Sequence, residues 1–403
     1  AAARLARSHR HGGRLMKRLL LIGGGHAHLF VLEAFARAPL PGVELVLVSP
    51  NQLAPYSGMM PGVIAWHYHY DQGCVDLAPL VRAAGCRWLK TIAVRFDPAS
   101  RVVLCENGSR LDYDLLSINT GSTPPPQTVP GVAEYSIPVK PIETFLDRWR
   151  YLSVEVACRR PLNIVVVGGG AAGVEVVTAM RHRLARSTWH SHRFHLVGRQ
   201  DTLLHHLAPQ AGHAAARVLR ALGITLHLGQ AVNAVTRDYV ALADGTRIDS
   251  DFTIWATGSA APAWPRAAGL AVDDAGFIAI EPTLRSCSHP DVFAAGDVAS
   301  LVDRPHPKSG VYAVKAGPVL AANLRAALQD QALTPWTPQT RALALLSTGD
   351  RHAIGAWGNW VWQGRWAWRW KDYIDRRFVA RFAAHKLAAH SHSSKENPSC
   401  ATK

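Results

Sequence analysis

Three glycines that follow a short β-branched run give the clearest chemical signal in this sequence. Gly168, Gly170 and Gly173 fill all three glycine positions of the G-x-G-x-x-G pattern, between a predicted strand and a predicted helix. The first glycine permits a tight turn, the second lets a pyrophosphate approach the backbone, and the third allows close helix–strand packing. The helix N-terminus then presents N–H groups to the phosphates. This cluster predicts a dinucleotide site.

A second glycine cluster, near the start of the chain, matches the pattern less completely. Gly23 and Gly25 take the first two glycine positions, His26 begins the predicted helix, and His28 stands where the third glycine belongs. The third glycine normally allows close helix–strand packing, so His28 makes this part of the match to the pattern looser. Ser49 closes the next predicted strand, where an acidic residue would bind ribose hydroxyls. The cluster indicates a second dinucleotide site; a glycine turn without a ligand is the alternative.

The strand that follows the complete glycine pattern ends without an acidic residue. NAD sites usually carry Asp or Glu there, but this chain has Gly198 followed by Arg199. The missing carboxylate removes repulsion of a 2′-phosphate, and a guanidinium can pair with one. NADPH is therefore an option beside NADH. The alternative is that Arg199 is a solvated loop arginine.

Three further apolar strands end in residues that suit nucleotide binding. A carboxylate at the end of a strand, beside a helix N-terminus, is well placed to accept hydrogen bonds from ribityl hydroxyls. A simple helix cap is the other interpretation of that carboxylate. The residues at these strand ends are Thr120, Gly121, Thr257, Gly258, Gly296 and Asp297.

These motifs lie in two strand–turn–helix–strand units, about one domain length apart. A proline-rich stretch, 122–129, separates them and indicates a crossing between domains, because three successive prolines fit neither a helix nor a central strand. We expect strands at 17–22, 43–48, 115–118, 163–167, 194–197 and 252–255, and helices at 26–37, 171–183 and 311–328.

The predicted fold class is α/β, with two Rossmann-like dinucleotide-binding domains, the second inserted in the first, and a small Trp-rich C-terminal region. The expected segments are a disordered basic extension at 1–16, the first domain at 17–140 and 271–335, the second at 141–270, the Trp-rich region at 336–389 and a disordered tail at 390–403.

The composition limits the partners. The 403 residues carry a net charge of +15, which favours anionic partners, but the basic residues mostly do not cluster. No zinc-finger spacing or RNA-binding signature occurs, so we predict no nucleic-acid partner. The six cysteines show no C-x-x-C spacing, and the paired histidines form no complete ligand set, so we predict neither a disulfide framework nor a metal.

The Trp-rich region supports two interpretations. Tryptophan beside arginine and lysine suits a membrane interface. The alternation of Trp366, Trp368 and Trp370 instead favours a strand, within a small β-rich or mixed subdomain that packs its tryptophans on the first domain.

The order and spacing of these motifs resemble the pyridine nucleotide-disulfide oxidoreductase superfamily of flavoproteins. Within it the chain is similar to type II NADH dehydrogenases and sulfide:quinone reductases. It also resembles the flavoprotein often fused ahead of selenophosphate synthetase. That match is carried by GGGHAHL (23–29), PYSGMMPGVIA (55–65), KSGVYAVKAGPVLAANL (308–324) and GRWAWRWKDYIDRRF (364–378).

The resemblance implies a role for each motif residue. Lys308 and Tyr312 would lie near the flavin. FAD would be bound by Gly23, Gly25, His26, Ser49, Thr120, Gly121, Gly296 and Asp297. NAD(P)H would be bound by Gly168, Gly170, Gly173, Glu175, Arg199, Thr257 and Gly258.

The resemblance also implies hydride transfer from NAD(P)H to the flavin, followed by electron transfer to an acceptor. We expect a quinone, because the segment 51–62 lacks the paired cysteines of the disulfide reductases. One alternative is a sulfide:quinone reductase that uses Cys158 or Cys287. Another is a flavoprotein partner or redox sensor that serves selenophosphate synthetase. We expect a cytoplasmic protein, with peripheral contact to the inner membrane face as a further option.

Overall fold

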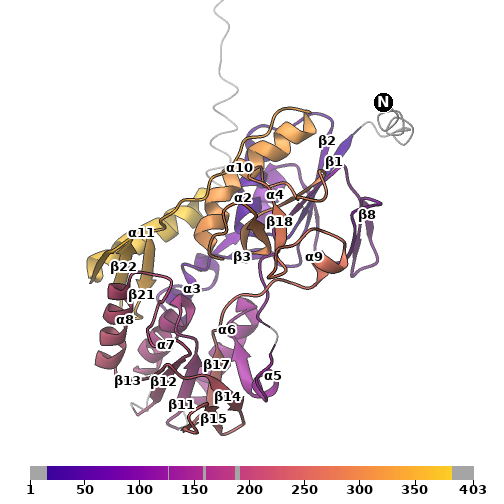
Figure 1. The fold of residues 1–403 in the computed structure, drawn as a ribbon. Helices are drawn as coiled ribbons and strands as arrows, with labels where there is room; N and C mark the ends of the chain where they lie inside the picture. Colours follow the sequence, from indigo (N-terminus) through magenta and orange to yellow (C-terminus); the bar gives the residue numbers. More distant parts are fainter. Residues whose placement is uncertain (1–15, 126, 158–159, 187–190, 384–403) are drawn as a thin grey trace, which may run out of the picture.

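Two lobes, each built around a five-stranded parallel sheet, make up most of the protein (Figure 1). A smaller C-terminal layer runs along one side of both. The computed structural model describes residues 16–125, 127–157, 160–186 and 191–383. The predicted disordered segments lie outside these ranges, except for Met16. In the described part of the chain, no helix is long and apolar enough to cross a bilayer.

The first sheet has the strand order β19-β9-β1-β2-β5. Parallel strands with both faces covered need continuous apolar runs, which accounts for LLLI in β1 and LVLV in β2. Helices α2 and α10 pack against each other and share one core with these strands. The elements are β1 (Lys17–Ile22), β2 (Val43–Val48), β5 (Arg87–Leu89), β9 (Leu115–Ile118), β19 (Val292–Ala294), α2 (His26–Arg37), α4 (Leu77–Ala83) and α10 (Gly310–Leu328).

The second sheet has the order β10-β17-β11-β12-β13. Residues of β11 alternate between two cores: Ile164 and Val166 face α7 and α8, and Val165 and Val167 face an antiparallel meander. The elements are β10 (Ser136–Pro138), β11 (Asn163–Val167), β12 (Arg193–Gly198), β13 (Ile224–Leu228), β17 (Phe252–Trp255), α7 (Ala171–Leu184), α8 (Pro209–Ala221) and the meander β14 (Val232–Val235), β15 (Tyr239–Leu242) and β16 (Arg247–Asp249).

The second lobe is inserted in the first, as the sequence predicted. All strands of the second sheet precede β19, yet β19 pairs with β9 of the first sheet. The residue boundaries of the domains stay a prediction. The smaller elements are β3 (Leu53–Pro55), β4 (Cys74–Asp76), β6 (Ala93–Asp97), β7 (Val102–Cys105), β8 (Arg110–Asp112), β18 (Ile278–Ile280), β20 (Ala299–Leu301), α3 (Met60–Ile64), α5 (Val132–Tyr135), α6 (Ile142–Tyr151) and α9 (Trp264–Ala267).

The C-terminal layer is an antiparallel sheet followed by a helix: β21 (Ala344–Ser347), β22 (Ala353–Trp357), β23 (Trp360–Gly364) and α11 (Arg365–Arg381). The strand predicted from the alternating tryptophans is therefore wrong, because these residues begin α11. Trp366 and Trp370 are one helical turn apart, and both rings stack on Trp362 of β23, at 6.2 and 6.1 Å. The aromatic spacing reflects this stack rather than a strand.

This layer contacts both lobes. Phe378 of α11 stacks on Tyr56 at 4.4 Å, and Phe382 packs on Phe30 of α2 at 5.3 Å. Strands β21 and β22 contact α7 and α8 of the second lobe. Phe378 and Phe382 thus bind this layer to the first lobe, together with Trp368, whose ring lies 5.9 Å from that of His67, while several other tryptophans remain at the surface.

Candidate functional site

Asn119, the residue after β9, shapes the first glycine turn. Gly23 has a φ of +93°, and a Cβ added there would lie 2.5 Å from the backbone oxygen of Asn119. A Cβ on Gly25 would collide with the side-chain oxygen of Asn119. That oxygen accepts a hydrogen bond from the Ala27 N–H at 3.0 Å, and the side-chain amide donates to the Ala295 carbonyl at 2.6 Å. Asn119 thus joins three strand ends, and both glycines make room for it.

His28, at the third glycine position of the first turn, packs between α2 and the sheet. The side chain is fully buried, and Nδ1 lies 2.6 Å from the Gly23 carbonyl. Because a carbonyl can only accept, Nδ1 carries the proton and Nε2 accepts from the Ser117 hydroxyl at 2.9 Å. Burial lowers the pKa of His28 to about 4, so the ring is neutral. The imidazole fills the space that a third glycine would leave.

His26 and Ser49 lie on either side of this turn. The half-buried His26 ring donates from Nε2 to the Pro55 carbonyl at 3.2 Å and contacts Tyr56 at 5.4 Å between ring centroids. Ser49 is buried at the end of β2, with its hydroxyl 3.1 Å from where a Cβ of Gly24 would stand. The structure therefore brings both predicted residues to the edge where the strands of the first sheet end.

The two Thr-Gly motifs run side by side between the lobes. Thr123 and Ala260, which follow them, exchange two backbone hydrogen bonds of 2.9 and 2.8 Å. Lys140 lies at this crossing, because its Nζ donates to the hydroxyls of Ser122 and Ser259 at 3.1 and 3.3 Å. The same Nζ is 3.6 Å from the Asp297 carboxylate. The predicted residues gathered here are Thr120, Gly121, Thr257, Gly258, Gly296 and Asp297.

Each glycine of the second turn has its own structural reason. Gly168 has a φ of +137°, and a side chain there would collide with the Ala256 carbonyl. A Cβ on Gly173 would collide with the Gly168 carbonyl, so this glycine permits the close packing of α7. Around Gly170, in contrast, no atom of the described residues other than its chain neighbours lies within 4 Å of the Cβ position. Backbone atoms thus crowd the turn at Gly168 and Gly173, whereas space remains beside Gly170.

Lys308 and Tyr312 flank the start of α10. The Lys308 ammonium donates to the Ala299 carbonyl at 2.5 Å and lies 4.0 Å above the Phe277 ring. Tyr312 is buried in the first core. Gly310, the first residue of α10, lies beside His26, since its Cβ position is 3.6 Å from the His26 Nδ1 atom. The role of Lys308 and Tyr312 beside the flavin stays a prediction.

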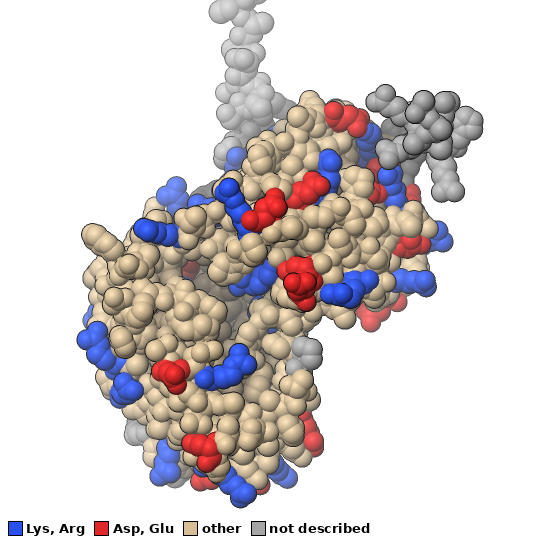
Figure 2. All heavy atoms as spheres, in the orientation of Figure 1, with Lys and Arg blue, Asp and Glu red and all other residues tan. Residues whose placement is uncertain are grey.

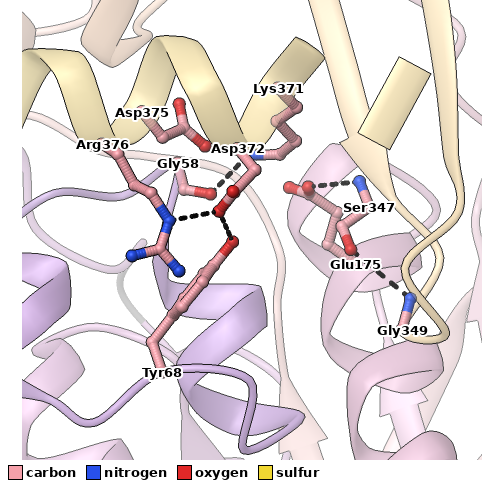
Figure 3. Close-up of polar contacts among 9 residues, drawn as sticks. All are labelled: Gly58, Tyr68, Glu175, Ser347, Gly349, Lys371, Asp372, Asp375 and Arg376. Carbon is pink, nitrogen blue, oxygen red and sulfur yellow. Dashed lines mark hydrogen bonds and ion pairs between the residues drawn. The ribbon is translucent and has the colours of Figure 1, made fainter. Parts of the chain in front are cut away.

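Glu175 lies where the second lobe meets the C-terminal layer (Figure 3). Its Oε1 atom accepts a hydrogen bond of 2.8 Å from the Ser347 N–H of β21. Burial raises the pKa of Glu175 to about 7, although the positive charge of Lys371 opposes the shift. Glu175 therefore changes its protonation close to neutral pH. Sequence reasoning placed it with the nicotinamide cofactor and did not foresee its contact with β21.

Lys371 and Asp375 of α11 form a buried ion pair at the same junction (Figure 3). The two residues are only 6% and 7% exposed, and the Nζ–Oδ2 distance is 2.7 Å. Nζ also donates to the Gly58 carbonyl of the first lobe. Burial lowers the pKa of Lys371, but Asp375 and Glu175 outweigh it and raise the pKa, so the ammonium stays charged. Sequence reasoning missed this pair, although its i, i+4 spacing was a signal.

A second contact fixes α11 to the loop after α3. The Tyr68 hydroxyl donates to Asp372 Oδ1 at 2.5 Å, and Arg376 Nε donates to the same oxygen at 2.8 Å (Figure 3). The Arg376 guanidinium also lies 4.8 Å from the centre of the Tyr68 ring. Helix α11 is thus held to the first lobe by polar contacts as well as by its phenylalanines.

The lobes and the C-terminal layer surround a hollow, and basic residues are spread over this face rather than gathered (Figure 2). The cysteines Cys74, Cys86 and Cys105 are buried and Cys287 is exposed, while Cys158 lies outside the described residues. The described histidines, cysteines and carboxylates include no cluster that could hold a metal ion.

Two parallel sheets, each with a glycine turn between a strand and a helix, define a redox protein that holds two dinucleotides. The chain belongs to the pyridine nucleotide-disulphide oxidoreductase family, whose model matches residues 17–317. It is thus an oxidoreductase that uses FAD and NAD(P)H.

Curated relatives carry related names. The chain is 26% identical over 301 residues to the NADH dehydrogenase-like protein Rv1812c of Mycobacterium tuberculosis, which covers 71% of this chain and 73% of the relative. It is 24% identical over 295 residues to the demethylphylloquinone reductase NdbB of Synechocystis, which covers 70% and 72% of the two chains.

Two solved structures share the fold. One is NDH2 from Plasmodium falciparum in complex with NADH, with a TM-score of 0.79, 13% identity and coverage of 94% and 98%. The other is the sulfide:quinone oxidoreductase of Aquifex aeolicus, with a TM-score of 0.76, 18% identity and 92% coverage of each chain. At these identities the likeness concerns the fold.

The residues present fit both cofactors. At Gly121, as at Gly170, the part of the chain that the structure describes places no atom beyond the chain neighbours within 4 Å of the Cβ position, so each site has free space along its backbone. The carboxylate of Asp297 is 20% exposed, which leaves oxygen atoms able to accept hydrogen bonds from hydroxyl groups. A pyrophosphate on each glycine turn matches the arrangement expected at a strand-to-helix turn.

Proposed function

We propose that this protein is an NAD(P)H:quinone reductase. In the overall reaction, NAD(P)H, a proton and a quinone give NAD(P)⁺ and a quinol. The observation that carries the proposal is the pair of glycine turns, one in each lobe, whose following Thr-Gly motifs meet at a shared crossing; the second of these turns is open at Gly170. The names of the curated relatives, an NADH dehydrogenase-like protein and a demethylphylloquinone reductase, support the donor and the acceptor.

The protein's own contribution is mostly positional. Bound FAD supplies the relay that takes a hydride from the donor and gives two electrons to the acceptor. The turn at Gly168–Gly173 holds the donor, and the turn at Gly23–Gly25, with Asp297, holds the FAD. Lys140 ties the crossing between the lobes and sets their relative position. Positioning of this kind supplies most of the catalysis in hydride transfer.

Quinone reduction also consumes protons, and Glu175 is suited to hold one. Its pKa of about 7 means that both protonation states are populated at neutral pH. The neighbouring Lys371 remains charged and favours the release of that proton. A proton can thus be held where the second lobe meets the C-terminal layer.

The proposal is tested by anaerobic oxidation of NADH or NADPH with a short-chain ubiquinone as the acceptor. We expect consumption of equal amounts of nicotinamide and quinone. Sulfide that reduces the flavin without nicotinamide would instead support a sulfide:quinone reductase. Flavin that is bound but turns over no quinone would support the third alternative, a partner or sensor of selenophosphate synthetase.

We further propose that the C-terminal layer docks on an anionic membrane surface, at the inner face. The exposed face of α11 combines tryptophan and Tyr373 with Arg365 and Arg369, which suits a headgroup region. The exposed tryptophans of the C-terminal layer are Trp357 (48%), Trp360 (79%), Trp366 (55%) and Trp370 (40%).

Co-sedimentation with vesicles tests this docking. We expect binding to phosphatidylglycerol-containing vesicles and weaker binding of Trp360→Ser and Trp366→Ser. Tyr151→Ser is the control, because Tyr151 is 61% exposed on α6, away from this layer. Equal sedimentation of all three variants with the wild type would contradict the proposal.

A further inference from the structure

The end of β12 lies directly beside the second glycine turn. Gly198 closes this strand, and its Cβ position is 3.6 Å from the Cα atom of Gly169. An acidic side chain here would reach the adenosine ribose of a dinucleotide held by the turn and would repel a phosphate on its 2′ oxygen. Because residue 198 is a glycine, the strand end contributes no such charge.

The loop after β12 folds back onto the same turn. The Leu204 N–H donates to the Gly169 carbonyl at 2.9 Å, and a Leu203 methyl lies 3.4 Å from the Cβ position of Gly169. From the other side, Gly212 of α8 lies so close to Leu203 that a Cβ would collide with its carbonyl. The loop 199–207 is therefore held against the turn at its middle.

This loop presents cationic and ionisable groups at the surface. Arg199 and His205 are exposed, and the His205 ring lies 3.7 Å from that of His206. Arg199 is near enough to contribute to the lowered pKa of His205, after burial and His206. The acid of the loop, Asp201, lies against Gly229 at the end of β13.

We infer that the nicotinamide donor is NADPH, and that Arg199 and His205 bind its 2′-phosphate. A guanidinium matches a phosphate with two parallel hydrogen bonds, and the imidazole supplies a further donor. The inference rests on the proposed function, since it names the donor that the same site takes. It assigns the discrimination to the loop after β12 and not to the glycine turn, which accepts either dinucleotide.

The test measures binding without turnover. Adenosine 2′,5′-bisphosphate and AMP are titrated into the FAD-loaded protein by calorimetry, followed by NADP⁺ and NAD⁺. We expect the bisphosphate to bind more tightly than AMP. Arg199→Gln should weaken the binding of the bisphosphate and of NADP⁺ about 10- to 100-fold, as expected for loss of a hydrogen bond to a charged group. The affinity for NAD⁺ should stay within about twofold of the wild type.

Two further variants sharpen the result. Arg217 is an exposed arginine of α8 in the same lobe, and Arg217→Gln should leave the affinities for NAD⁺ and NADP⁺ unchanged. Gly198→Glu should reverse the preference toward NAD⁺, and its nearest contact, 3.1 Å to a Leu228 methyl, is with a flexible side chain. Equal binding of NAD⁺ and NADP⁺ by the wild type, or equal weakening of both by Arg199→Gln, overturns the inference.

Failure of this inference can be told apart from failure of the proposed function. Flavin reduced by NADH but not by NADPH would overturn the NADPH assignment and leave the oxidoreductase intact. Flavin that neither nicotinamide reduces would contradict the proposed function, while preferential binding of the bisphosphate would still support the phosphate-binding loop.

Discussion

The ammonium group of Lys371, in the C-terminal helix, donates a hydrogen bond to the backbone carbonyl of Gly58 in the first lobe. The same group forms an ion pair with Asp375 and lies close enough to Glu175 of the second lobe to influence its pKa. One buried charge therefore connects three parts of the chain that are distant in sequence. Its surroundings account for two of the predictions below.

Replacing Lys371 with methionine should destabilise the fold. The substitution leaves Asp375 buried without its partner, and breaking a buried pair in this way costs about 3–5 kcal/mol. Urea unfolding followed by tryptophan fluorescence measures the loss. Arg377→Met, at an exposed position of the same helix, should stay within about 0.5 kcal/mol. The double variant with Asp375→Leu should recover much of the stability, and no recovery would mean that the pair is not the cause.

Stability should depend on pH through Glu175. Because its pKa is raised to about 7, the folded protein keeps a proton on this group that the unfolded chain releases above about pH 4.5. The free energy of unfolding should then fall by about 2 kcal/mol as the pH rises through this window, a value reduced because Glu175 keeps some solvent contact.

Glu175→Gln carries no ionisable group and should lose this pH dependence. Urea unfolding at about pH 5 and about pH 8 provides the comparison. Glu106→Gln, at an exposed turn of the first lobe, serves as the control and should follow the wild type. If Glu175→Gln shows the same slope as the wild type, another group must carry the proton.

His28→Ala should destabilise the first lobe by about 2–4 kcal/mol, since it opens a cavity and leaves the Gly23 carbonyl and Ser117 hydroxyl without their partner. Flavin retention should fall as well, because the ring supports the glycine turn. Thermal unfolding and the ratio of flavin to protein absorbance measure both effects. His213→Ala, at an exposed position of α8, should leave both unchanged. An unchanged melting temperature in His28→Ala would refute this role.

Two glycines of the second turn should respond differently to the same substitution. Gly173→Ala places a methyl group against the Gly168 carbonyl and should cost about 1–3 kcal/mol. Gly170→Ala places a methyl group in open space, so the free energy of unfolding should change by no more than about 0.5 kcal/mol. The affinity for the nicotinamide cofactor should fall. Unfolding and calorimetric binding of the nicotinamide separate the two effects. A folding defect in both variants would contradict the open site at Gly170.

Local patterns predicted much of the fold. The strands β1, β2 and β9 and the helix α2 begin and end at the predicted residues, because continuous apolar runs and glycine turns identify them without distant contacts. The repeated unit and the proline-rich crossing predicted two domains, and the family resemblance implied that the second is inserted in the first. The shared C-terminal edges of parallel strands explain why the motif residues gather.

Contacts between distant segments were missed. The role of Asn119 was not predicted, because its partners Ala27 and Ala295 are far away in sequence. Lys140 went unnoticed for the same reason. The alternating tryptophans of α11 suggested a strand. In the structure their spacing instead allows a ring stack on Trp362, and no local pattern reveals that contact.

The central claim, that two separate sites hold FAD and NAD(P)H, is tested most directly by anaerobic titration of the flavin absorbance in the wild type and in Gly170→Trp. In the wild type, NAD(P)H should bleach the flavin band and a quinone should restore it. In Gly170→Trp, the flavin should stay bound and the nicotinamide should no longer reduce it. Wild-type protein without flavin, or flavin that neither nicotinamide bleaches, would contradict the account.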